Sequence, residues 1–127
     1  GGGVSNDISI PVSAVPRFIS RASPALEAAF PGCRLIPYGH IGDGNLHYNL
    51  LPPLDDRDAF LARAEVVRDR VYEFTLAEGG SIAAEHGIGS AKRERLPRVK
   101  DALELELMRG LKALLDPAGL CNPGKVL

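Results

Sequence analysis

The sequence predicts an α+β fold: a ferredoxin-like antiparallel sheet in the order β-α-β-β-α-β, with a C-terminal helix and tail. Short segments that suit strands alternate with long stretches whose apolar residues recur at helical spacing. Two of the short segments flank a turn rich in Gly, Asp and Asn, which is typical of a β-hairpin. The 127 residues are one domain's length, so we expect a single domain over residues 1–127.

The first half of this pattern extends to the hairpin. Apolar and polar residues alternate over residues 8–12, which predicts a short strand. A helix is expected over residues 16–30, and Pro24 either kinks it or restarts it. The apolar run at residues 33–38 predicts a buried strand, and the alternating residues 46–51 form the other arm of the hairpin.

The second half contains a long helix, a short strand and a final helix. The long helix is expected from residue 55 or 56 to residue 79, and the strand over residues 81–84. A basic turn or short helix is expected over residues 92–96. The final helix is expected over residues 99–115, with a tail that packs back on the body. The inward face of this final helix is expected to carry four leucines at helical spacing, Leu103, Leu107, Leu111 and Leu114.

The composition excludes several classes of protein. Apolar residues make up 45% of the chain and charged residues 24%, which is ordinary for a globular protein and unlike a disordered one. The formal net charge is −1, so the chain has no strong positive electrostatic field that would attract nucleic acid. We therefore expect no nucleic-acid partner. No apolar run approaches the roughly 18 residues of a membrane span, and residues 1–4 do not resemble a signal peptide.

The two cysteines, Cys33 and Cys121, are far apart and form no CxxC pair. This usage favours a reduced intracellular protein over a disulfide-bonded one. Cys33 is interpreted as a small core residue. We therefore expect a cytoplasmic location, and peripheral association of the full protein with a membrane is left open.

All three histidines of the chain lie in or beside two glycine-rich turns. His40 and His47 flank the hairpin turn in the segment HIGDGNLH, and a tight turn brings its two sides together. Glu85 precedes His86 in the segment EHGIG. Two imidazoles and a carboxylate are a common set of ligands for a divalent metal, with positions left for water or substrate. From spacing alone, a metal site and ordinary polar roles for these side chains both stay open.

Two further residues are candidates for contact with a ligand. Asn49 lies two positions after His47, so both are expected on the same face of a strand. His86 follows Glu85 directly and would stand just outside the metal's ligands, where an imidazole suits a general base. Asp43, in contrast, is interpreted as a turn former.

Three segments together resemble a known family. The segments HIGDGNLH at residues 40–47, EHGIG at residues 85–89 and DPAGLCNPGK at residues 116–125 are similar to the C-terminal domain of the FAD-linked oxidases. These are flavoproteins of the vanillyl-alcohol oxidase group, of the D-lactate, glycolate and D-2-hydroxyglutarate dehydrogenase type. The segment DISIPV at residues 7–12 also resembles the usual start of that domain, so the resemblance covers nearly the whole chain.

The resemblance implies a role for each candidate residue. It implies that His40, His47 and Glu85 bind a divalent metal, zinc or manganese. It also implies that His86 is the catalytic base and that Asn49 helps to hold the substrate carboxylate. The implied reaction oxidises a small 2-hydroxy acid to a 2-oxo acid, with hydride transfer to FAD.

The chain departs from the family's pattern in two places. The family's FAD-binding domain precedes this one and has no counterpart in the chain, and no strand–GxGxxG–helix unit replaces it. We therefore expect that missing domain to be a partner that holds most of the FAD, and the isolated domain to be inactive. Ser5 and Asn6 stand where some relatives have a basic residue, so the contact to a second substrate carboxylate stays open. A homo-oligomer is also left open.

Two other interpretations remain. A non-catalytic ferredoxin-like module that binds a ligand or a partner fits the fold equally well, but it does not explain the histidines in the glycine-rich turns. A stand-alone metal-dependent hydrolase would use the same ligands to activate water. Every metal hypothesis requires Glu85 to reach the two histidines. A plain ferredoxin-like sheet opposes this, because its hairpin lies at the other end from the close of the last strand.

Overall fold

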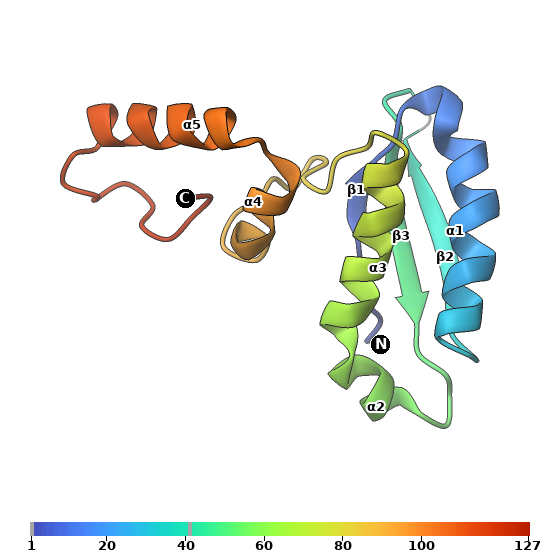
Figure 1. Ribbon diagram of the computed structural model, residues 1–127. Helices are drawn as coiled ribbons and strands as arrows, with labels where there is room; N and C mark the ends of the chain where they lie inside the picture. Colours follow the sequence, from blue (N-terminus) through green and yellow to red (C-terminus); the bar gives the residue numbers. More distant parts are fainter. Residues whose placement is uncertain (1, 41) are drawn as a thin grey trace. The chain divides into compact units, whose positions relative to one another are not determined.

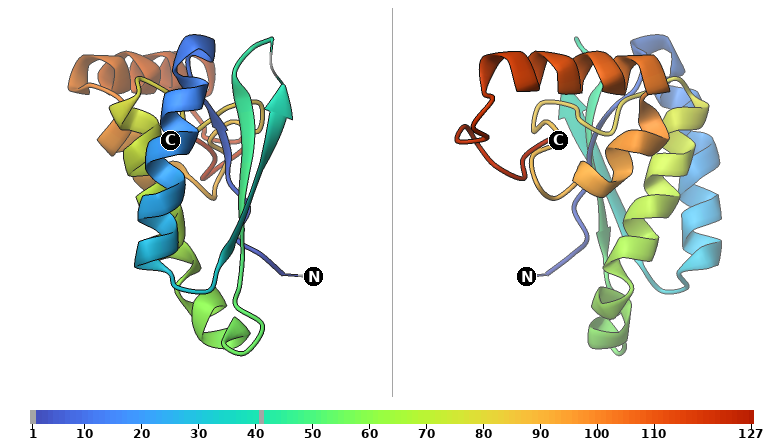
Figure 2. Two further views of the ribbon diagram at one scale, coloured as in Figure 1. Left: turned by 90° about the vertical axis from the view of Figure 1, so that its right-hand side faces the viewer. Right: turned by 60° about the vertical axis from the view of Figure 1, so that its left-hand side comes forward.

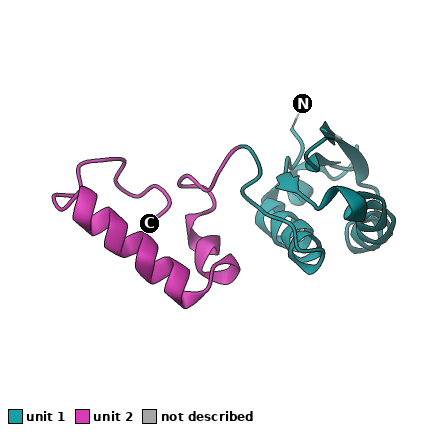
Figure 3. Ribbon diagram, turned by 90° about the horizontal axis from the view of Figure 1, so that it is seen from above, with its two compact units in different colours: residues 1–85 teal, residues 86–127 magenta. Residues whose placement is uncertain are grey.

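The computed structural model describes residues 2–40 and 42–127. The chain divides into two compact units, residues 1–85 and residues 86–127 (Figure 3). The first unit contains the sheet and the helices that pack on it. The second contains short helices, one longer helix and the C-terminal tail.

The described residues of the first unit form a three-stranded antiparallel sheet with helices on one side (Figures 1 and 2). The strands β1 (Asp7–Ser9), β2 (Arg34–His40) and β3 (Asn45–Leu51) are arranged in the order β1-β3-β2. A 3₁₀ turn, η1 (Val12–Ala14), leads into α1 (Val15–Ala29), and a short helix, α2 (Arg57–Ala62), precedes α3 (Ala64–Ala77). This architecture confirms the predicted α+β class.

The alternation of residues along the central strand β3 separates the two faces of the sheet. Leu46, Tyr48 and Leu50 are at most 7% exposed and lie on the face that the helices cover. Phe18 of α1 packs edge to face on Tyr48, with ring centroids 5.3 Å apart. The alternate residues of β3, which include His47, face the opposite side, which α1 and α3 leave uncovered.

The strand expected over residues 81–84 is reduced to a single bridge. Ser9 and Ser81 exchange two backbone hydrogen bonds, of 2.9 and 2.8 Å, in the place where a ferredoxin-like sheet has its fourth strand. Ile82 is buried, but the chain then turns because Ala84 has a φ of 40°. A positive φ is incompatible with an extended strand, so the pairing stops there.

Four further details of the first unit differ from expectation. The strand expected over residues 8–12 is β1 at Asp7–Ser9, and Val12 already begins η1. Pro24 lies inside an unbroken α1, so it does not restart the helix. The long helix expected over residues 55–79 is two helices that meet at Arg63, whose guanidinium lies 5.1 Å from the centroid of the Phe30 ring. The strand β2 is mostly exposed rather than buried, because it is an edge strand that pairs only with β3 among the described residues. Cys33, just before β2, is a buried free thiol as expected, and its burial raises its pKa.

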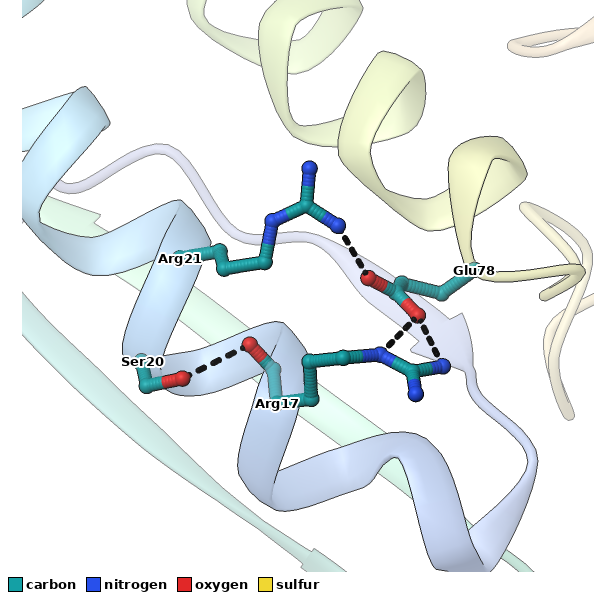
Figure 4. Close-up of polar contacts among 4 residues, drawn as sticks. All are labelled: Arg17, Ser20, Arg21 and Glu78. Carbon is teal, nitrogen blue, oxygen red and sulfur yellow. Dashed lines mark hydrogen bonds and ion pairs between the residues drawn. The ribbon is translucent and has the colours of Figure 1, made fainter.

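An ion-pair cluster joins α1 to the end of α3 (Figure 4). Arg17 donates from Nε and Nη2 to Oε2 of Glu78, at 2.8 and 2.6 Å, and Arg21 donates from Nη1 to Oε1 at 3.0 Å. The Glu78 side chain is 6% exposed, and its two partners account for both carboxylate oxygens. These hydrogen bonds, those of Arg17 first, lower the pKa of Glu78.

The second unit consists of η2 (Arg93–Arg95), α4 (Leu96–Val99), α5 (Ala102–Leu115) and the tail. The helix α5 begins three residues later than expected because Asp101 and Glu104 form a capping box: Asp101 Oδ1 accepts from the Glu104 backbone at 2.8 Å, and Glu104 accepts in return. The tail folds back within its own unit, where Val126 N donates to the Gly89 carbonyl at 2.8 Å. No helix in the described part of the chain is long and apolar enough to cross a membrane.

The four leucines expected on the inner face of α5 are instead exposed. Each of them is at least 59% exposed, and the least exposed stripe of α5 is formed by Leu105, Met108 and Lys112. The second unit is short and has few apolar residues, so it can cover only one side of α5 and leaves the leucines of the other side exposed. The leucines that are exposed are Leu103, Leu107, Leu111 and Leu114.

Candidate functional site

The candidate residues lie on the face of the sheet that α1 and α3 leave uncovered. His47 on β3 is paired with Asp7 on β1 and with Tyr38 on β2. Residues paired across strands point to the same face, so these three side chains share one side of the sheet. Asn49 follows on that face two residues later, as predicted, and His40 lies on it at the end of β2.

The hairpin places the two histidines side by side. The ring centroids of His40 and His47 are 5.6 Å apart, and the rings meet edge to face. Among the described residues of the turn between them, Gly44 N donates to the His40 carbonyl at 3.1 Å, and Asn45 N donates to Oδ1 of Asp43 at 3.0 Å. Asp43 is therefore a turn former, as its sequence context predicts.

Two glycines fix the shape of this hairpin. A Cβ on Gly44 would lie 1.9 Å from the carbonyl oxygen of Ile10, and the residue has a φ of 73°. A Cβ on Gly39 would lie 1.9 Å from the carbonyl oxygen of Asn45. Both positions require a residue without a side chain, because the backbone of a neighbouring segment occupies that space. The glycines of the turn thus set the position of the histidines beside them.

Glu85 reaches His47 from the segment that follows the Ser9–Ser81 bridge. Its Oε1 lies 3.4 Å from Nε2 of His47. One ligand atom each from His40, His47 and Glu85 lie within 4.8 Å of one another. In a plain ferredoxin-like sheet, the last strand would end far from the hairpin. The bend at Ala84 avoids this separation, because the chain leaves the edge of the sheet before a fourth strand can carry Glu85 away.

The chemistry of this set suits a divalent cation. Two imidazole nitrogens and a carboxylate oxygen are preferred ligands, and ligand bonds of roughly 2.0–2.2 Å place such atoms close to one another. The side chain of His47 is 20% exposed, whereas those of His40 and Glu85 are 53% and 46% exposed. One ligand is therefore held firmly by the sheet, and the other two border an open side that water or a substrate can enter.

Asp7 is a residue of this site that sequence reasoning missed. Its side chain is 5% exposed, and Oδ1 lies 3.3 Å from Nδ1 of His47. Asp7 lies within the segment that resembles the start of the family's domain, but the alternation that predicted a strand begins only at Ile8. Only the register of β1 on β3 shows that the carboxylate faces His47.

The other two predicted site residues belong to different units of the chain. Asn49 is half-buried, and its side chain has no hydrogen bond to another described residue. His86 follows Glu85 directly in the chain and is the first residue of the second unit. Their roles toward a substrate stay predictions.

Comparison with known proteins identifies the family. The family model described as FAD linked oxidases, C-terminal domain, matches residues 1–126. The chain belongs to this family. It is 41% identical over 122 residues to the D-2-hydroxyglutarate dehydrogenase of Stutzerimonas stutzeri and 43% identical over 122 residues to that of Xanthomonas citri pv. viticola. It is 37% identical over 123 residues to a probable mitochondrial D-lactate dehydrogenase of Danio rerio.

These matches cover nearly all of this chain but a small part of each relative. The two D-2-hydroxyglutarate dehydrogenases are matched over 95% of this chain and 26% of their own length. For the D-lactate dehydrogenase the shares are 97% and 24%. The chain therefore spans about a quarter of the length of the curated relatives it matches.

Proposed function

We propose that this chain is the substrate- and metal-binding domain of an FAD-dependent oxidoreductase that oxidises a D-2-hydroxy acid to a 2-oxo acid. The observation that carries the proposal is the convergence of His40, His47 and Glu85 on the uncovered face of the sheet. Membership of the FAD-linked oxidase family supports the cofactor. Because two relatives with at least 41% identity are named for D-2-hydroxyglutarate, this acid is the first substrate to test.

In this proposal His40, His47 and Glu85 hold the divalent cation, zinc or manganese. When bound, the cation supplies a Lewis acid that lowers the pKa of the substrate hydroxyl. The protein holds the ligands unequally, since His47 is fixed in the sheet while His40 and Glu85 lie at its open side. That side leaves room for the substrate's hydroxyl and carboxylate oxygens.

Asn49 and His86 act on the substrate itself. Asn49 donates an amide N–H to the substrate carboxylate and thereby fixes its orientation on the sheet face. His86 accepts the hydroxyl proton as a hydride leaves C2, and loss of the proton raises the electron density that expels the hydride. FAD, held mainly by a domain outside this chain, supplies the hydride acceptor.

The FAD-binding domain is therefore a required partner in this proposal, and the isolated chain is inactive. A cytoplasmic enzyme is part of the proposal because both cysteines are free thiols, which suits a reducing compartment. Some relatives are named as mitochondrial, and that location is stated for those proteins only.

The test is a dye-coupled assay of the complete FAD-loaded protein with D-2-hydroxyglutarate and D-lactate. We expect turnover that is lost after chelation, returns with zinc or manganese, and falls at least about 100-fold in His47→Ala. Glu27→Gln, an exposed change on α1, is the matched control and keeps full activity. Failure to oxidise any 2-hydroxy acid would contradict the proposal, and chelator-sensitive ester hydrolysis would favour a hydrolase instead.

A further inference from the structure

We propose that Asp7 is a positioning residue of the metal centre. Its carboxylate holds the imidazole of His47 with the proton on Nδ1, so that the lone pair of Nε2 points toward Glu85 and the cation. This inference rests on the metal site of the proposed function. It goes beyond that function by assigning a task to a buried acidic residue that would otherwise have no role in the reaction.

The register of the sheet brings the two side chains together. Asp7 and His47 are direct partners across β1 and β3. Tyr48 N donates to the Asn6 carbonyl at 2.7 Å across the adjacent pair. Because hydrogen-bonded and non-hydrogen-bonded pairs alternate, Asp7 and His47 form the non-hydrogen-bonded kind, in which side chains approach more closely.

The neighbouring residue Asn6 holds this register in place. Its Nδ2 donates to the Tyr48 carbonyl at 2.9 Å, in addition to the backbone bond at the same pair. Asn6 is 2% exposed. The carboxylate of Asp7 is therefore carried by a segment that is clamped to β3 directly beside His47, which limits how far the two groups can separate.

The two nitrogens of the His47 ring face two different carboxylates. Nδ1 lies 3.3 Å from Oδ1 of Asp7, and Nε2 lies 3.4 Å from Oε1 of Glu85. A neutral imidazole carries one proton, and a carboxylate acceptor favours that proton on the nitrogen it faces. Both nitrogens of His47 face a carboxylate, so the cation decides between them. Glu85 is also a candidate ligand, so a cation between Glu85 and His47 requires the unprotonated nitrogen to be Nε2.

Burial separates the tasks of the two carboxylates. The Asp7 side chain is 5% exposed, whereas that of Glu85 is 46% exposed. The exposed carboxylate borders the side that a cation and a substrate can enter, and the buried one lies beside Nδ1 of His47. A carboxylate behind a metal-bound histidine fixes the ring's tautomer and orientation and raises its basicity as a ligand.

The experiment compares Asp7→Ala and Asp7→Asn with Ser9→Ala in the complete protein. Ser9 is the control because it lies two residues along β1 on the same face and pairs with Asn45. Labelling with ¹⁵N-histidine reports the tautomer of His47 in the metal-free protein, with the resonance assigned by its loss in His47→Ala. Zinc titration then measures affinity, and denaturant unfolding shows that each variant is folded.

We expect Asp7→Ala to move the proton of His47 away from Nδ1 and to weaken zinc binding on the order of 10–100-fold. Asp7→Asn retains an acceptor oxygen and gives a smaller loss, and it carries the test if Asp7→Ala does not fold. Ser9→Ala changes neither quantity. An unchanged tautomer overturns the inference even if zinc affinity falls, because Asp7 would then act as a ligand or as part of the core.

These outcomes are separate from those of the proposed function. If the wild-type protein binds no zinc or manganese, the proposed function fails, while the tautomer in the metal-free protein still tests Asp7. If the wild type binds metal and His47→Ala does not, the site stands, and the Asp7 variants alone decide the inference.

Discussion

Glu85 and His47 are 38 residues apart in the sequence, yet Oε1 of Glu85 lies 3.4 Å from Nε2 of His47. A full fourth strand beginning at Ser81 would run along β1 and carry Glu85 away from the hairpin. The chain instead makes one bridge, between Ser9 and Ser81, and bends at Ala84. The early end of this strand is what assembles the candidate site.

The strained residue at this bend gives a first prediction. Ala84 has a φ of 40°, a region that costs an alanine roughly 1–2 kcal/mol and a glycine nothing. We expect Ala84→Gly to leave the free energy of unfolding unchanged or slightly higher. The control Ala28→Gly, on the exposed side of α1, should lower it by roughly 0.5–1 kcal/mol. Equal losses in urea unfolding of the two variants would show that Ala84 carries no strain.

The hairpin turn gives a second prediction, for Gly44→Ala. The added Cβ meets the Ile10 carbonyl at 1.9 Å on a residue with a φ of 73°, so the segments must move apart. We expect a loss of more than about 2 kcal/mol in the free energy of unfolding and weaker metal binding. Gly42→Ala is the matched control, because a Cβ there meets no atom within 4 Å in the described part of the chain, its immediate neighbours aside. A Gly44→Ala protein as stable as Gly42→Ala would be inconsistent with this packing.

The ion-pair cluster at Glu78 gives a third prediction, on pH dependence. Arg17, with Arg21, lowers the pKa of Glu78 in the folded protein. Such a group stabilises the fold above its unfolded pKa, near 4.3, and this stabilisation is lost as the pH falls through the lower folded value. We expect Glu78→Gln to lower the unfolding free energy at neutral pH and to differ little from wild type in strong acid.

The control for this cluster is Glu73→Gln. Glu73 forms one exposed pair with Arg70 at 2.6 Å, and such surface pairs contribute little. The pH profile of unfolding by denaturant should therefore hardly change in Glu73→Gln. A Glu78→Gln profile parallel to that of wild type from neutral pH to strong acid would argue against the cluster.

A fourth prediction separates the metal ligands from the proposed base. In the complete protein, His40→Ala should lose stoichiometric zinc or manganese together with turnover. His86→Ala should keep the metal and lose on the order of 10²–10⁴-fold in kcat, because only the proton acceptor is gone. Metal analysis alongside steady-state kinetics distinguishes the two. Loss of the metal in His86→Ala would instead make His86 a ligand.

Local pattern was enough to predict much of the fold. The helical spacing over residues 16–30 and the alternation over residues 46–51 each predicted an element with one buried face, and Phe18 and Tyr48 lie on those faces. The predictions that were wrong concern the burial of residues, which tertiary contacts determine. Apolar residues suggested a buried β2 and an inward leucine face on α5, but burial depends on what lies opposite, and no single segment contains that information.

The candidate site, too, was predictable only where local sequence determines the structure. His40 and His47 lie on either side of one turn, so their proximity follows from local sequence. The approach of Glu85 depends on a bend at Ala84, and alanine gives no sequence signal for a positive φ. The position of Asp7 depends on strand register, which sets a contact between residues 40 positions apart.

The most direct test of the account is anomalous diffraction from crystals of the complete protein soaked with zinc or manganese and measured at the edge of that metal. We expect one strong peak on the uncovered face of the sheet, within roughly 2.0–2.3 Å of a nitrogen of His40, Nε2 of His47 and a carboxylate oxygen of Glu85. A saturated crystal with no peak there, or with a peak bound by other side chains, would contradict it.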